Sequence, residues 1–177
     1  MNFPAWSTIE SEPAIFTGIL QELGVQDVKV EEIYSLDKSS FDPFEYALVY
    51  GLIFLFKWNE DANKAKAISV CENNVYFAKQ IVDNACATQA VLSIVLNRDD
   101  VSIGDDLLQF KDLTRNLTPQ EKGAAIGRSE LLRKVHNSFT ANFETENNYR
   151  REKSTKKTRE MQVEYDAYHF IAYVPMD

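Results

Sequence analysis

The chain has 177 residues, of which 45% are hydrophobic and 26% charged, and a formal net charge of −8. This composition suits one globular domain with a real core and excludes a disordered chain. The negative charge argues against nucleic-acid binding, because no basic stripe is large enough to offset the repulsion from phosphates.

The cellular setting is indicated by the cysteines and by the N-terminus. Two cysteines, Cys71 and Cys86, are too few for a disulfide framework. The first residues lack a basic segment followed by an apolar stretch, so no secretory signal is expected. No apolar run approaches the ~20 residues needed to cross a bilayer. We therefore expect a cytoplasmic and/or nuclear protein that does not bind membranes.

The first third of the chain predicts one helix and two strands. Ser11 can cap a helix with Pro13 in its first turn, and an apolar stripe continues until Gly24. Residues 28–36 carry β-branched side chains and predict a short strand. Residues 50–58 are nearly continuous apolar β-formers, which predicts a central strand buried on both faces.

The middle of the chain is predicted to be helical. A brief extended piece at residues 75–78 leads to residues 85–96, which contain no proline, glycine or charge and predict a helix buried on all sides. Residues 118–121 form a plausible cap followed by a first-turn proline and acid. Three more helices are predicted from apolar residues at helical spacing, at residues 105–115, 118–126 and 129–140.

Cys86 falls in the first turn of the buried helix. The unpaired backbone N–H groups and the positive end of the helix dipole favour a thiolate there, which is the nucleophilic form of cysteine. Its small neighbours leave room for a substrate. Free cysteines are nevertheless more often small buried hydrophobes, so both interpretations stay open.

The last part of the chain changes in character. Residues 142–162 lack an apolar period, and six cations lie between Arg150 and Arg159. Such a long loop is either a functional lid or a solvated insertion without a role. Residues 165–174 then resume as a strand. The sequence shows no repeats and no second domain.

Only two histidines could activate a cysteine. His136 lies among charges on a predicted helix, which favours a solvent-facing side chain. His169 lies within a strand of aromatic residues, where it is either a satisfied core residue or an imidazole held beside a nucleophile. Spacing alone does not choose between these two roles.

Other kinds of chemistry are disfavoured. Two cysteines and two histidines without C-x-x-C or H-x-x-x-H spacing do not easily assemble a metal site. Neither a phosphate-binding glycine loop nor a G-x-S-x-G elbow occurs, which argues against nucleotide binding and serine hydrolysis. The sequence predicts neither a metal nor a cofactor.

Two motifs carry a resemblance to a known family. Gln80 precedes Cys86 by six positions in Q-x-x-x-N-A-C-A-T, and His169 lies in D-A-Y-H-F-I-A-Y-V-P. Together they resemble the ubiquitin carboxy-terminal hydrolase family of cysteine deubiquitinases, in particular its proteasome-associated, long-tailed branch. The resemblance covers nearly the whole chain in the family's order, including residues 6–13, 30–36, 51–58 and 135–139.

The resemblance implies a papain-like α/β fold, in which helices flank a central antiparallel sheet. Residues 1–177 would form a single catalytic domain, and residues 142–162 would be the crossover loop that arches over the active site. Cys86 would be the nucleophile, His169 the base, and Gln80 an oxyanion-hole donor. The implied reaction is hydrolysis of (iso)peptide or thioester bonds at the C-terminal glycine of ubiquitin, without a cofactor.

The chain departs from the family at its C-terminus. The family's orienting aspartate lies fifteen positions after the histidine, which would be position 184, beyond the last residue. Asp177 would lie roughly 26 Å from His169 along an extended strand, too far to replace it. The resemblance therefore implies a truncated domain with its last strands and its proteasome-docking tail missing, and impaired activity. The alternative is a non-catalytic ubiquitin-binding fragment or truncated isoform.

Overall fold

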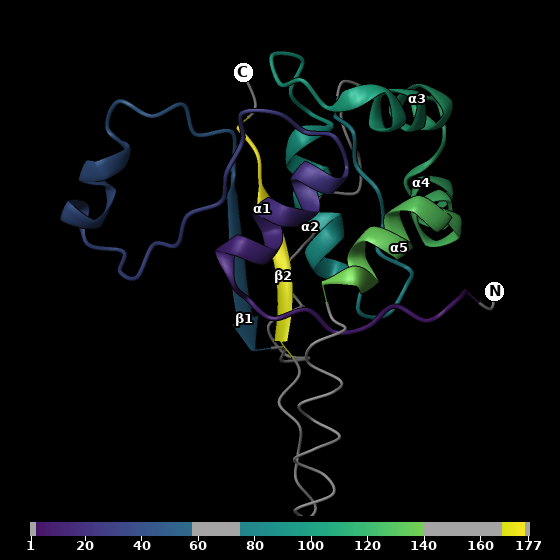
Figure 1. Cartoon of the computed structure of the whole chain (residues 1–177), viewed down its shortest axis with the longest axis horizontal. Helices are drawn as coiled ribbons and strands as arrows, with labels where there is room; N and C mark the ends of the chain where they lie inside the picture. The colour runs from purple at the N-terminus through teal and green to yellow at the C-terminus, as the bar shows by residue number, and fades with distance from the viewer. Residues whose placement is uncertain (1–2, 58–74, 140–167, 176–177) are drawn as a thin grey trace, which may run out of the picture.

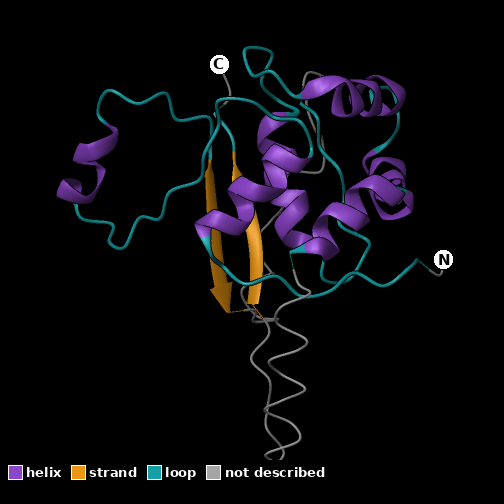
Figure 2. Ribbon diagram, in the orientation of Figure 1, coloured by secondary structure: helices purple, strands orange, loops and turns teal. Residues whose placement is uncertain are grey.

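The computed structural model describes residues 3–57, 75–139 and 168–175. The α-helices gather on one side of a small antiparallel sheet, so the predicted α/β class is confirmed (Figures 1 and 2). The elements in chain order are α1 (Pro13–Glu22), the 3-10 helix η1 (Lys38–Phe44), β1 (Leu52–Lys57), α2 (Cys86–Val95), α3 (Gly104–Thr114), α4 (Pro119–Arg128), α5 (Glu130–Ser138) and β2 (Tyr168–Tyr173).

The predicted helices are all present, with small differences at their ends. Helix α1 begins at Pro13 as expected, but its N-cap is Glu12 and no side chain caps it, so the prediction of Ser11 as the cap is wrong by one residue. Helix α4 begins with the predicted cap: Glu121 N donates to Thr118 Oγ1 at 3.3 Å, and Thr118 N donates to Glu121 Oε2 at 2.9 Å. These reciprocal bonds satisfy backbone donors that a helix start otherwise leaves unpaired.

Helix α2 lies at the centre of the molecule, between the sheet and the other helices (Figure 1). Seven of its ten residues are buried, and Cys86, Gln89 and Ser93 are partly buried. The predicted burial on all sides is confirmed in that no α2 side chain is exposed. The same core cluster includes Leu107 from α3 and Leu132 from α5, each 1% exposed or less.

Strands β1 and β2 pair antiparallel, and within the described residues they form a two-stranded sheet. The prediction that the strand at residues 50–58 is buried on both faces is wrong, because Leu52 and Phe54 of β1 are 46% and 48% exposed. Successive side chains of a strand point to opposite faces. Helix α2 packs against β2, and only the face that carries Leu55 and Phe170 joins the core.

Residues 28–36 form no strand, which corrects the sequence prediction. The backbone N–H of Val30 instead donates to Thr17 Oγ1 on α1 at 2.9 Å. Val28 and Val30 pack partly against the core, so their β-branched character serves packing rather than a sheet. The chain then projects away from the helices through η1 (Figure 1), and Tyr34, Leu36 and Tyr46 are each more than 85% exposed.

Some predictions fall outside the described residues. These are the crossover loop at residues 142–162, Cys71, and the first residues of the predicted strand at 165–174. Across residues 3–57, 75–139 and 168–175, no helix combines the length and the apolar character that a bilayer-spanning segment requires. In the same part of the chain, no three His, Cys, Asp or Glu side chains gather as they would around a metal ion.

Candidate active site

Cys86 is the first residue of α2, as the sequence predicts. Its N-cap is Ala85, whose side chain makes no capping hydrogen bond to the helix start. The first N–H groups of α2 have no partner within the helix, and the helix dipole places a partial positive charge at this end. The Cys86 side chain is partly buried against the core, while Ala85 and Ala87 are each only 1% exposed. The thiol thus lies at the N-terminal end of a buried helix and is still accessible to solvent.

The turn that precedes Cys86 has an unusual backbone. Asn84 has a positive φ of 64°, a conformation that asparagine tolerates better than most residues. Its side-chain amide donates to the carbonyl oxygen of Trp6 at 3.0 Å. The turn that delivers the chain into α2 is therefore tied to the N-terminal segment.

The segment that carries Gln80 is held by two helices. Gln89 Nε2 on α2 donates to the Ala78 carbonyl at 2.6 Å, and Lys79 N donates to the Pro119 carbonyl at 2.8 Å. A Cβ built on Gly123 of α4 would lie 1.9 Å from the Lys79 carbonyl oxygen, so this close approach requires glycine. The backbone next to Gln80 is therefore fixed from both sides.

The Gln80 side chain makes a local hydrogen bond. Its Nε2 donates to the Val82 carbonyl at 3.2 Å, and the side chain is partly buried. A primary amide has two N–H donors, so one hydrogen remains for another acceptor while this bond is intact.

His169 is the second residue of β2, where it pairs with Phe56 of β1. Its ring meets that of Phe56 edge to face, with centroids 5.8 Å apart. The side chain is partly buried, and this desolvation lowers the pKa of His169. A lowered pKa favours the neutral imidazole at neutral pH, which is the form that accepts a proton.

The packing of α2 on β2 brings the elements that carry Cys86 and His169 together. A Cβ built on Gly51 would lie 2.9 Å from Ile94 Cγ1 and 2.8 Å from the Tyr173 carbonyl oxygen, so α2 ends beside the end of β2. Cys86 lies about 12 Å before Ile94 along the helix, and His169 about 13 Å before Tyr173 along the strand. Since α2 runs alongside β2 (Figure 1), both lie toward the same end of the molecule.

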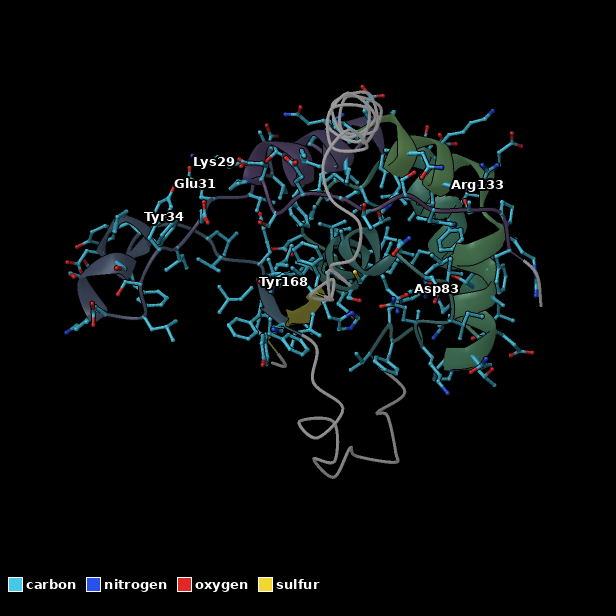
Figure 3. All side chains as sticks on the ribbon, turned by 90° about the horizontal axis from the view of Figure 1, so that it is seen from below. Lys29, Glu31, Tyr34, Asp83, Arg133 and Tyr168 are labelled. Atoms are coloured by element: carbon cyan, nitrogen blue, oxygen red, sulfur yellow. The ribbon has the colours of Figure 1, made fainter. Side chains whose placement is uncertain are left out.

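That end of the molecule is seen directly in Figure 3. Tyr168, at the start of β2, and Asp83, in the turn before α2, lie on either side of the end of α2. Strand alternation places His169 on the sheet face that also carries Phe56, opposite the face that carries Phe170. The imidazole is therefore at the margin of the core and not inside it.

The prediction that His136 faces solvent is wrong. The side chain is 0% exposed, His136 Nδ1 lies 2.7 Å from Thr88 Oγ1, and His136 Nε2 lies 2.7 Å from the Ser7 carbonyl oxygen. Burial lowers the pKa of His136, and the bond to Ser7 opposes that shift. Both ring nitrogens have a partner, which is what allows a histidine to be buried.

The sequence contains a signal for this burial. Leu132, Val135, His136 and Phe139 follow the i, i+3, i+4, i+7 spacing of one helix face. All four are buried or pack against the core. Periodicity places His136 on the buried face, whereas the charged neighbours that suggested exposure lie on the other faces of α5.

A cysteine at an uncapped helix start, packed toward a strand that carries a histidine, is an arrangement used by cysteine hydrolases. The comparisons give the family. The chain belongs to the family described as ubiquitin carboxyl-terminal hydrolase, family 1, which it matches over residues 6–177. The family resemblance predicted from the sequence is thereby confirmed.

Two curated relatives show how far the likeness extends. Ubiquitin carboxyl-terminal hydrolase isozyme L5 of Dictyostelium discoideum is 43% identical over 174 residues, covering 96% of this chain and 46% of the relative. Ubiquitin carboxyl-terminal hydrolase 2 of Schizosaccharomyces pombe is 44% identical over 172 residues, covering 96% of this chain and 54% of the relative. The chain spans about half the length of these relatives.

A solved structure shares the fold. The catalytic domain of Trichinella spiralis UCH37, bound to ubiquitin vinyl methyl ester, superimposes with a TM-score of 0.76 at 33% sequence identity. The match covers 97% of this chain and 70% of that one. The arrangement of helices on an antiparallel sheet is therefore that of a ubiquitin hydrolase catalytic domain.

Proposed function

We propose that this chain carries the thiol-dependent chemistry of its family and hydrolyses (iso)peptide or thioester bonds at the C-terminal glycine of ubiquitin. The observation that carries the proposal is the position of Cys86, at the uncapped start of a buried helix that packs against the strand bearing His169. Family membership supports the substrate class, and the positions of Cys86 and His169 on adjacent elements support the proposed roles of nucleophile and base.

The chemistry assigns one role to each of these two side chains. The neutral imidazole of His169 takes the thiol proton, and the Cys86 thiolate attacks the carbonyl carbon of the terminal glycine. The carbon–nitrogen bond of an isopeptide then breaks, and the imidazolium gives its proton to the leaving amine. Water hydrolyses the resulting thioester, which regenerates the thiol and releases the ubiquitin carboxylate.

Gln80 is proposed to stabilise the oxyanion of the tetrahedral intermediate. Its amide has a second N–H beside the one bound to Val82, and the Cys86 backbone N–H offers another donor at the helix start. The two helices that hold the neighbouring backbone support this role, because a donor is effective only when it is already in place.

The proposed partner is ubiquitin or a ubiquitin conjugate. The related Trichinella spiralis UCH37 catalytic domain was crystallised with ubiquitin vinyl methyl ester, which supports ubiquitin recognition by this fold. We propose residues 142–162 as the crossover loop over the site and residues 1–177 as one catalytic domain. Binding to the proteasome, which the resemblance implies for full-length members of the branch, and a cytoplasmic and/or nuclear location are further proposals.

The test uses ubiquitin with a C-terminal electrophile. We expect a single covalent adduct on Cys86, located by peptide mapping, and no adduct with Cys86→Ala. Cys71→Ser is the matched control, and it should label like the unmutated chain. If ubiquitin binds but no adduct forms on a folded chain, the proposal is wrong and the chain is a non-catalytic ubiquitin-binding protein.

A further inference from the structure

The N-terminal segment at residues 5–7, here called the strap, is bound by polar side chains from two other parts of the chain. Asn84 donates to the Trp6 carbonyl at 3.0 Å, and His136 lies 2.7 Å from the Ser7 carbonyl. Asn137 donates to the Ala5 carbonyl at 3.3 Å and accepts from Ser7 N at 3.1 Å. Every residue of the strap therefore has a side-chain partner.

The donor and the acceptor of each hydrogen bond of His136 can be assigned. The Ser7 carbonyl can only accept, so His136 Nε2 carries the hydrogen. In the neutral ring Nδ1 is then an acceptor, and the Thr88 hydroxyl donates to it at 2.7 Å. The imidazole joins α2 to the strap, and the edge-to-face contact of its ring with Trp6, at 4.8 Å between centroids, holds the ring in place.

The links to the strap start at residues that are equally spaced in sequence on either side of Cys86. Asn84 is two residues before Cys86, and Thr88 is two residues after it. The first is bound to the Trp6 carbonyl, and the second reaches the next carbonyl, that of Ser7, through His136. The first turn of α2 is thus held on both sides of Cys86 by two consecutive peptide groups of a segment about eighty residues away in sequence.

We propose that Asn84, Thr88 and His136 are positioning residues that hold the first turn of α2 on the strap and thereby set the place of the Cys86 thiol. This inference rests on the proposed function and goes beyond it, because none of the three residues belongs to the proposed nucleophile, base or oxyanion donor. The physical reason is that a displacement of about 1 Å at a reacting group can cost as much as a hundredfold in rate.

Thr88 offers the sharpest test because the chain contains a matched control. Thr88 and Thr114 are both buried threonines whose hydroxyl groups have a side-chain partner. The Thr88 hydroxyl on α2 bonds His136 Nδ1 at 2.7 Å, and the Thr114 hydroxyl on α3 bonds the Tyr76 hydroxyl at 2.8 Å. Thr88→Val and Thr114→Val each replace a buried hydroxyl by a methyl group. We expect Thr88→Val alone to slow labelling of Cys86, by about tenfold to a hundredfold.

The labelling is followed in two ways in each variant. The ubiquitin electrophile gives a maximal rate and a half-saturating concentration, and only the maximal rate should fall. Iodoacetamide reports the reactivity of Cys86 without ubiquitin, and peptide mapping separates it from Cys71. Thr88→Ser keeps the hydroxyl and should restore both rates, which a purely structural role for the Thr88 methyl group would not predict.

Asn84→Gly is a second variant that tests the same network without changing a core residue. Asn84 is exposed at a positive φ, which glycine adopts without strain, so the substitution removes only the bond to Trp6. We expect the same selective fall in the maximal rate. If Thr88→Val does not fold, as judged by circular dichroism, Asn84→Gly decides the question alone.

Two further outcomes complete the test. Equal labelling of Asn84→Gly, Thr88→Val, Thr114→Val and the unmutated chain would overturn the positioning network. If ubiquitin labels none of them but the iodoacetamide rates still separate Thr88→Val from Thr114→Val, the proposed function fails and the network stands.

Discussion

The two sides of the candidate site are held in different ways. On the cysteine side, the thiol begins a central helix, and its neighbours Ala85 and Ala87 are each 1% exposed. On the histidine side, His169 lies on the sheet formed by β1 and β2, where Leu52 and Phe54 are nearly half exposed. The proposed nucleophile therefore begins a helix inside the core, while the proposed base lies at the margin of the core.

The difference predicts which substitutions will affect folding and which will affect only chemistry. A change in α2 removes packing shared by several helices, so it should lower stability as well as reactivity. A change at His169 or on the exposed face of β1 removes few core contacts, so it should leave the fold intact. We expect the largest effect from loss of the His169 imidazole and the smallest from a change of pH.

His169→Gln should abolish turnover and leave the chain folded. Loss of the base in a triad-type site costs on the order of 10⁴–10⁶ in rate. The measurement is hydrolysis of a ubiquitin C-terminal amide with a fluorescent leaving group, together with the thermal midpoint. His136→Gln is the control for a histidine that lies inside the core, and it should lower the thermal midpoint. Full activity of His169→Gln would remove His169 from the proposed mechanism.

Gln80→Ala should lower the rate by about 10²–10³, because one oxyanion donor is lost. The effect should fall on kcat and leave KM nearly unchanged, since the donor acts in the transition state. Gln120→Ala, at an exposed position of α4, is the control that tests whether loss of any glutamine near this helix matters. A change in KM alone would assign Gln80 to substrate binding.

Leu92→Ala and Leu52→Ala compare the same substitution on the two sides of the molecule. Leu92 on α2 is 1% exposed, and Leu52 on β1 is 46% exposed. We expect Leu92→Ala to lower the free energy of unfolding by about 2–5 kcal/mol and Leu52→Ala by about 1 kcal/mol. Urea unfolding measures both. Equal losses would mean that β1 is covered as fully as α2.

Thr118→Ala should lower the free energy of unfolding by about 1 kcal/mol, because it removes the cap of α4. The effect on activity should be small, since the contact of α4 with the Gln80 segment uses the Pro119 carbonyl and the Gly123 backbone. Thr118→Ser keeps the hydroxyl and should retain the stability. A large loss of activity in Thr118→Ala would make the cap part of the site.

The smallest expected effect is a pH dependence of stability. Burial lowers the pKa of His136 below its ordinary value of about 6.5, so the unfolded chain binds its proton first as the pH falls. This contribution to stability is complete above about pH 6.5 and is lost as the pH falls toward the folded pKa. The bond to Ser7 opposes the shift, which keeps the effect modest.

The pH dependence is measured as the free energy of unfolding between about pH 5 and pH 8. The pKa of His169 is also lowered by burial, so it contributes with the same sign. We therefore expect His136→Phe and His169→Gln each to reduce, without abolishing, the slope of the free energy of unfolding against pH. A slope that His136→Phe leaves unchanged would contradict the assignment to the buried imidazole.

Much of the fold could be predicted from local patterns. The helices at α1, α2, α4 and α5 follow from apolar spacing, a first-turn proline, and the cap at Thr118. Local patterns also predict a strand at residues 28–36, which the structure does not contain. The reason is that β-branched residues favour any extended segment, whether or not it joins a sheet. Whether such a segment joins a sheet depends on a neighbour, and here the Val30 N–H bonds to Thr17 on α1.

The candidate site was predicted in part. The motifs around Gln80, Cys86 and His169 identify the family, and the comparisons confirm it. The role of each residue stays a prediction that the labelling and turnover experiments test. The sequence prediction that His136 faces solvent is wrong, because the charged residues beside it in the sequence lie on other faces of the helix.

The sequence by itself indicated an uncharged helix at residues 85–96 with Cys86 in its first turn, and a resemblance to the family of ubiquitin hydrolases to which the chain belongs. Both follow from short runs of neighbouring residues, which carry helix propensity and family motifs. Only the tertiary structure decided that Leu52 and Phe54 on one face of β1 are nearly half exposed, that His136 bonds Thr88 and Ser7, and that the strap binds on both sides of Cys86. These features depend on contacts between residues up to about 130 positions apart, which no local pattern encodes.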